Sequence, residues 1–97
     1  MRETVRDCTR EPGRFRNRIT NEIVTAMQWR KWNHYHITAW LADDSDVCTF
    51  EWNPFGDMFV YCSDGMLYLR PMDWIIRTDT GIVPCASRIF DQLCEEL

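Results

Sequence analysis

The fold class follows from residues 58–70, which read MFVYCSDGMLYLR. Two runs rich in apolar and aromatic residues flank Ser63-Asp64-Gly65, and glycine after aspartate supplies the positive φ of a tight hairpin loop. A second pair of apolar runs, 74–77 and 82–85, flanks Thr78-Asp79-Thr80-Gly81 in the same way. This part of the chain is therefore predicted to be an antiparallel meander.

Further strands and two helices are predicted on either side of the meander. Residues 15–29 read as one long strand, bent near Thr20-Asn21, because β-branched and aromatic residues are frequent and Gly and Pro are absent. Asn33 is predicted to cap a short helix that ends near Asp43-Asp44, and Ser87 to cap a last helix. Pro84 cannot donate to a ladder, so it is predicted to lie at a sheet edge or at the end of its strand. The other predicted strands are 47–52, 58–62, 66–70, 74–77 and 82–85.

The fold class is predicted to be α+β, as one small domain. A chain of 97 residues is too short for two cores. We expect an antiparallel sheet of about five to six strands, with one helix after the first strand and a short C-terminal helix. Pro12-Gly13 breaks regular structure, so residues 1–13 are predicted to form a flexible or helical arm and residues 14–97 the domain.

The charge is unevenly distributed along the chain. Residues 1–31 carry eight basic and four acidic side chains, whereas residues 32–97 carry three basic and eleven acidic ones. The net charge of −4 argues against direct nucleic-acid binding, which depends on neutralising phosphates. Five widely spaced cysteines without a signal peptide indicate reduced thiols in a cytoplasm, and no apolar run is long enough to span a membrane.

Two short signatures, one near each end, resemble a family of small phage and prophage proteins of unknown function. The first is Phe15-Arg16-Asn17-Arg18, followed by a strand that ends in Ala26-Met27-Gln28-Trp29. The second is Asp73-Trp74-Ile75-Ile76, then Gly81, Pro84-Cys85 and Ile89-Phe90. Met72 stands where that family usually has glycine, and Ala86-Ser87 where it has Lys-Pro. The resemblance implies a phage genome and the cytoplasm of a bacterial host, without naming a reaction.

For the residues that could bind a metal or act in catalysis, a structural role is favoured over a chemical one. His34 and His36 lie two residues apart on a predicted helix and point in different directions, which disfavours a shared zinc ion. Cys85 lacks an assigned base, so a structural thiol is favoured over a nucleophile. Asp73 is predicted to bond the amides of its own turn. We therefore predict no enzyme activity, no metal and no cofactor.

Binding is the remaining class of function. Five tryptophans are more than so small a core needs, and aromatic residues are enriched at protein interfaces. The predicted partner-binding residues are Trp29, Arg30, Trp32, Asp43, Asp44, Asp46 and Glu51. If these acids and Asp57 gathered on one exposed face, the face could occupy a nucleic-acid groove by imitating phosphates.

The leading hypothesis is a phage accessory protein that binds and inhibits a host protein, in counter-defence such as an anti-CRISPR. A phage protein is an alternative partner. A second hypothesis is an oligomeric sponge for a nucleotide-like signal, with cations from Arg16, Arg18, Arg30 and Arg77 and a stacking plane from Trp29 or Trp32. A third is a minor structural component of the virion. A chain this short buries about 60–65% of its unfolded surface, so a homo-oligomer is also possible.

Overall fold

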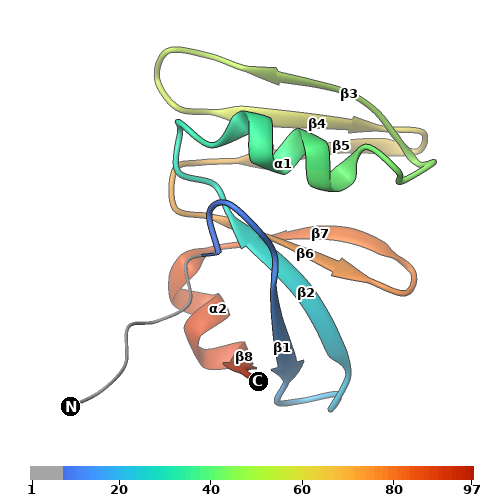
Figure 1. Ribbon diagram of the computed structural model, residues 1–97, viewed down its shortest axis with the longest axis vertical. Helices are drawn as coiled ribbons and strands as arrows, with labels where there is room; N and C mark the ends of the chain where they lie inside the picture. The colour runs from blue at the N-terminus through green and yellow to red at the C-terminus, as the bar shows by residue number, and fades with distance from the viewer. Residues whose placement is uncertain (1–7) are drawn as a thin grey trace.

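Figure 1 shows the computed structural model, which describes residues 8–97. These residues form eight strands and two helices. In chain order they are β1 (Gly13–Asn17), β2 (Ile23–Gln28), α1 (His34–Leu41), β3 (Val47–Trp52), β4 (Met58–Cys62), β5 (Gly65–Leu69), β6 (Trp74–Thr78), β7 (Gly81–Cys85), α2 (Ser87–Leu93) and β8 (Cys94–Glu96).

The strands form two antiparallel sheets, where the sequence led us to expect one. A five-stranded sheet has the order β7-β6-β2-β1-β8, and a three-stranded sheet has the order β3-β4-β5. β6 pairs with β2 and not with its predecessor β5 in the meander, and this divides the strands between the two sheets. The α+β class and the edge position of Pro84 in β7 are confirmed.

The predicted long first strand is wrong, because it is a hairpin of two strands. β1 and β2 pair antiparallel, with Phe15 opposite Val24. The Oδ1 atom of Asn17 accepts hydrogen bonds from the N–H groups of Ile19 and Thr20, and Asn21 takes a positive φ of 67°. Asparagine tolerates the left-handed region, so a turn forms here without glycine.

Both faces of the five-stranded sheet carry buried side chains. Side chains alternate along β2, so Val24 and Ala26 meet α2, whereas Met27 meets α1. On the α2 side, Phe90 stacks on Trp74 with ring centroids 3.9 Å apart. Both buried clusters of the protein therefore include residues of this sheet.

The three-stranded sheet is covered on one face only. Ile37 and Leu41 of α1 are fully buried against Met58, Val60 and Leu69 of that sheet. Figure 1 shows α1 lying between this sheet and the β6-β7 hairpin. On the other face of the three-stranded sheet, Glu51, Met66 and Tyr68 are exposed.

The helix starts differ in detail from the capping predictions. Asn33 precedes α1 as predicted but makes no side-chain cap. It is fully buried, its Nδ2 donates to the carbonyls of Thr9 and Gln28, and its Oδ1 accepts from the N–H of Arg30. Ser87 is the first residue of α2, with Ala86 at the cap position.

The domain starts earlier than residue 14. Cys8 is buried in the core beside α2, and its carbonyl accepts from the N–H of Gln28. Residues 8–13 are therefore part of the domain, and the rest of the predicted arm lies outside the described residues. Neither described helix is long and apolar enough to cross a membrane.

Candidate functional site

The open side of the three-stranded sheet carries four large apolar or aromatic side chains. Alternate residues of β4 point to opposite faces, so Phe59 and Tyr61 point away from the buried Met58 and Val60. The register places Tyr68 opposite Phe59 and Met66 opposite Tyr61. We call this surface the outer face and define it by six residues: Glu51, Asp57, Phe59, Tyr61, Met66 and Tyr68.

The outer face is ordered by its own contacts. Phe59 and Tyr68 stack with their ring centroids 5.3 Å apart. The hydroxyl of Tyr61 donates to Glu51 at 2.8 Å, and the hydroxyl of Tyr68 donates to Asp57 at 3.0 Å. These hydrogen bonds to carboxylates are the main cause that raises the pKa of both tyrosines, with burial and the negative charge of the carboxylates adding to it. The result is a preformed surface of aromatic rings and carboxylates.

A shallow hollow of about 370 Å³ lies at the free edge of β3. It is lined by Phe50, Glu51, Trp52, Asn53 and Phe59. The loop beyond this edge is held by the buried Trp29, whose indole N–H donates to the carbonyl of Gly56 at 2.6 Å. The hollow is therefore built on a fixed loop and a paired strand.

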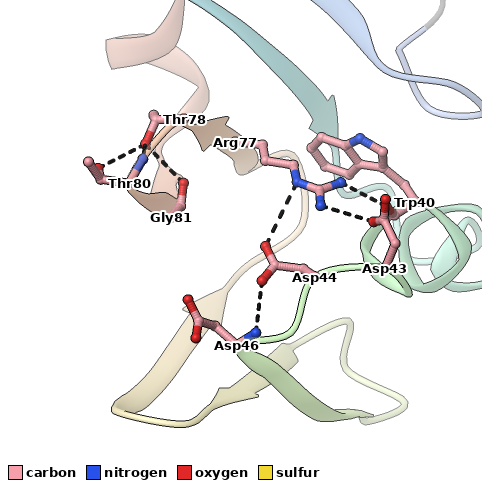
Figure 2. A network of polar contacts seen from close by, with 8 residues as sticks. All are labelled: Trp40, Asp43, Asp44, Asp46, Arg77, Thr78, Thr80 and Gly81. Atoms are coloured by element: carbon pink, nitrogen blue, oxygen red, sulfur yellow. Dashed lines mark hydrogen bonds and ion pairs between the residues drawn. The ribbon is translucent and has the colours of Figure 1, made fainter.

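The predicted acidic residues divide into two groups. Glu51 lies on the outer face, as does Asp57, whereas Asp43, Asp44 and Asp46 lie in the loop between α1 and β3 (Figure 2). Arg77 bonds Asp43 at 2.9 Å and approaches Asp44 at 3.8 Å. The Arg77 guanidinium lowers the pKa of Asp43, first by its hydrogen bond and then by its charge. The five acids therefore do not form one continuous exposed row.

Figure 2 also shows how Arg77 ties β6 to α1 and to the loop that follows this helix. Its guanidinium donates to the carbonyl of Trp40 at 3.0 Å, at the C-terminal part of α1. Within the loop between α1 and β3, the N–H of Asp46 donates a hydrogen bond to the carboxylate of Asp44. Arg77 is thus occupied by the protein itself and is no free cation for a ligand.

The other predicted ligand cations are partly occupied as well. Arg16 bonds Glu95 at 3.3 Å, and Arg18 lies 3.6 Å from the same carboxylate. Arg18 also donates to the carbonyls of Asp91 and Gln92. These contacts hold β8 and α2 onto β1.

The predicted aromatic patch separates into a core residue and a surface residue. Trp29 is fully buried, which corrects its assignment to a partner-binding surface. Trp32 is 52% exposed, and the guanidinium of Arg10 lies 5.7 Å from its ring centroid. Arg30 is exposed in the same turn.

The histidines and Cys85 face different surroundings. His34 stacks on Trp52 with ring centroids 4.3 Å apart, whereas His36 contacts Trp32 and Tyr35 edge-on. Burial, followed by the charge of Asp73, raises the pKa of the Cys85 thiol, which favours its neutral form. Residues 8–97 contain no group of three or more His, Cys, Asp and Glu side chains that could hold a metal.

Sequence reasoning missed the aromatic part of the outer face. Phe59, Tyr61, Met66 and Tyr68 were assigned to strands without a role. The signal was present in the lack of alternation, because 58–62 and 66–69 have no polar side and α1 can cover only one. An apolar strand at an uncovered sheet indicates an interface.

Known proteins offer no guide to this surface. The chain matches no family model, no curated protein and no solved structure.

Proposed function

We propose that this protein acts by binding a partner protein through the outer face, without catalysing a reaction. The observation that carries the proposal is an uncovered sheet face on which stacked aromatic rings alternate with carboxylates. Large exposed apolar patches on small proteins mark interaction sites, and tyrosine is frequent among hot-spot residues.

The charge of this region indicates the chemistry of the partner. Residues 43–73 contain seven acidic side chains and one basic side chain, Arg70. Opposite charges across an interface steer association and select partners. The proposed partner therefore presents arginine or lysine side chains. Aromatic rings add cation–π attraction of about 0.5–1 kcal/mol for each exposed contact.

In the phage setting that the resemblance implies, such a partner is a basic host protein whose nucleic-acid-binding surface the outer face covers. Inhibition of an immune effector is the form of this function that we propose. The proposal needs only Glu51, Asp57 and the aromatic rings, because Asp43 and Asp44 are bound to Arg77.

The experiment compares retention of proteins from a bacterial lysate by three tagged forms of the chain. The outer-face variant is Glu51→Lys/Tyr68→Lys. The matched control, Asp79→Lys/Val83→Lys, changes the charge by the same amount on the β6-β7 hairpin, where both residues are exposed. Circular dichroism establishes that all three forms fold.

We expect one basic protein to be retained by the natural chain and by the control. The outer-face variant should lose it, with a loss in affinity of at least about tenfold. Retention should also weaken as salt is added, because the exposed charges are screened. Equal retention by both variants, or no retained protein, would contradict the proposal.

A further inference from the structure

The free edge of β3 presents backbone groups that pair with no other strand within residues 8–97. β3 is an outer strand in the order β3-β4-β5. The N–H of Asn53 bonds the carbonyl of Asp57, which makes 53 and 57 a hydrogen-bonded pair of the ladder. Bonded pairs alternate along antiparallel strands, so Glu51 and Thr49 bond β4, whereas the N–H and C=O groups of Phe50 and Trp52 point to the free edge.

The hollow described above lies along the same edge. Glu51 is the one charged residue of its lining, and Phe59 lies on the same face of the sheet as Glu51. Phe50 and Trp52 line the hollow from the opposite side of β3. A carboxylate beside aromatic rings suits a guanidinium, because that group is planar, binds carboxylates through two N–H groups and stacks on rings. A lysine ammonium uses the carboxylate but stacks less well.

A second copy of this chain is a poor occupant for the edge. The strand Val47–Trp52 carries one acid and no base. Antiparallel pairing of two copies centred on Glu51 would place the two Glu51 side chains directly opposite each other, where like charges are destabilising, and pairing centred on Phe50 would make them diagonal neighbours on one face. It would also join two regions that each have seven acids and one base within residues 43–73. Charge complementarity instead favours a basic partner.

We propose that the edge of β3 accepts an extended, arginine-bearing segment of the partner as a fourth strand. Its backbone pairs with Phe50 and Trp52, and one arginine side chain enters the hollow and binds Glu51. This inference rests on the proposed function and specifies how the partner is recognised. Main-chain bonds give affinity in such strand addition, and the side-chain hollow gives specificity.

The test uses a synthetic probe, a peptide of alternating threonine and valine with one central arginine and blocked ends. Binding is measured by calorimetry and by backbone amide shifts in NMR spectra of the full chain. Two further peptides are N-methylated at alternate amides, each at the set that the other leaves free. In only one of them do the methyl groups lie on the backbone edge that faces β3. A third peptide replaces arginine with neutral citrulline.

We expect the probe to shift the amides of Phe50 and Trp52. The peptide methylated on the edge that faces β3 should bind about tenfold or more weakly than the unmethylated probe, because it has lost the N–H donors to β3. The other methylated peptide should bind with the same affinity as the probe. Citrulline in the peptide and Glu51→Gln in the protein should each weaken binding about tenfold, and their effects should not add. In Glu51→Gln the side-chain amide oxygen still accepts the hydrogen bond from the Tyr61 hydroxyl. The control Asp79→Asn, at an exposed hairpin residue, should leave affinity unchanged.

Failure of this inference is distinguishable from failure of the proposed function. Equal binding of both N-methylated peptides, or no peptide binding while the lysate partner still depends on the outer face, would overturn strand addition alone. A stable dimer that buries Phe50 and Trp52 would also overturn it, because the edge would then be occupied by a second copy. Loss of both peptide binding and outer-face-dependent retention would reject both proposals.

Discussion

Met72 adopts a backbone conformation that suits glycine better than methionine. Its φ is +80°, and its N–H donates to the carbonyl of Trp29 at 2.7 Å, so the surrounding structure fixes the turn. Residues with a Cβ atom are strained in the left-handed region by about 1–2 kcal/mol. The side chain is 43% exposed and therefore recovers only part of this cost by packing.

Replacing Met72 with glycine should therefore stabilise the protein. We expect the free energy of unfolding of Met72→Gly to rise by about 0.5–1 kcal/mol, the relief of strain being partly offset by the entropy of glycine in the unfolded chain. Urea denaturation measures the change. Met66→Gly is the control, since Met66 is a half-exposed strand residue, and it should destabilise. Equal destabilisation by both substitutions would show that position 72 is not strained.

Trp29 is expected to be among the most sensitive residues, although its sequence context indicated a surface. Trp29→Phe removes the indole donor of the buried Gly56 carbonyl and leaves a cavity. The expected loss in the free energy of unfolding is about 2–4 kcal/mol. The half-exposed Trp32 is the control, and Trp32→Phe should change stability by less than about 0.5 kcal/mol. Similar losses in thermal or urea unfolding would contradict this difference.

Local turn chemistry was the most predictable part at this scale. Asp73 accepts the N–H of Arg70 at 2.9 Å, as its place in the turn predicted. Asn33 was predicted at a helix start, but its three bonds involve Thr9, Gln28 and Arg30. The bond to Thr9 spans 24 residues of sequence, and no local pattern specifies such a contact.

The strands of the outer face can be tested through the ionisation of their tyrosines. Folding raises the pKa of Tyr61 and Tyr68 above the ordinary value of 10.0, so it favours the protonated hydroxyl. The stability that these hydroxyls contribute is present below pH 10 and is lost as the pH rises through their folded pKa values.

Titration of phenolate absorbance should therefore resolve two tyrosines above the ordinary pKa. In Glu51→Gln the pKa of Tyr61 should fall back towards 10.0, because the carboxylate that prefers the protonated hydroxyl is gone. Tyr68 bonds Asp57 and should titrate as before, which makes it an internal control. A Tyr61 pKa that does not respond would contradict the hydrogen bond.

The ion pair between Asp43, in the loop after α1, and Arg77 of β6 should weaken at acidic pH. The pKa of Asp43 lies below its ordinary value of 3.8 because of Arg77, so its contribution to stability is present above that pH. This contribution is lost as the pH falls through the folded pKa. Asp43→Asn should flatten the acid limb of the stability profile. Asp79→Asn is the control in the same urea titrations, and equal slopes in both variants would contradict the link.

Hairpins were predictable at the scale of elements, whereas their assembly was not. The loops at Ser63-Asp64 and at residues 79–80 lie where glycine and aspartate placed them. The first hairpin was missed because Asn21 supplies the positive φ instead of glycine. β8 was also missed, since it is only three residues long and its partner β1 lies at the other end of the described chain.

Two sheets arise because β6 pairs with β2, and the segment between them holds α1 and all three strands of the smaller sheet. In this pairing Gln28 lies opposite Trp74. The pairing buries Met27 and Ile75 in one core cluster and Ala26 and Ile76 in the other. Sequence periodicity indicates which side chains are buried but not which strand they meet. The same division leaves the three-stranded sheet with an uncovered side, so the candidate site is a consequence of the strand order.

The charge of the whole molecule follows this division. Residues 43–73 carry seven acids and one base, whereas the remainder of the chain carries eight acids and ten bases. The net charge of −4 therefore arises from the part of the chain that builds the outer face. A partner with a basic surface should approach from that side, because long-range attraction orients the encounter.

Hydrogen exchange of the complex and of the free chain tests most directly whether the outer face binds the partner. With the lysate partner bound, we expect new protection of backbone amides in β3, β4 and β5, largest along the free edge of β3. Exchange in β1, β2 and β8 should stay unchanged. New protection confined to α2 or β7, with β3 to β5 exchanging as in the free chain, would contradict the claim that the outer face is the binding site.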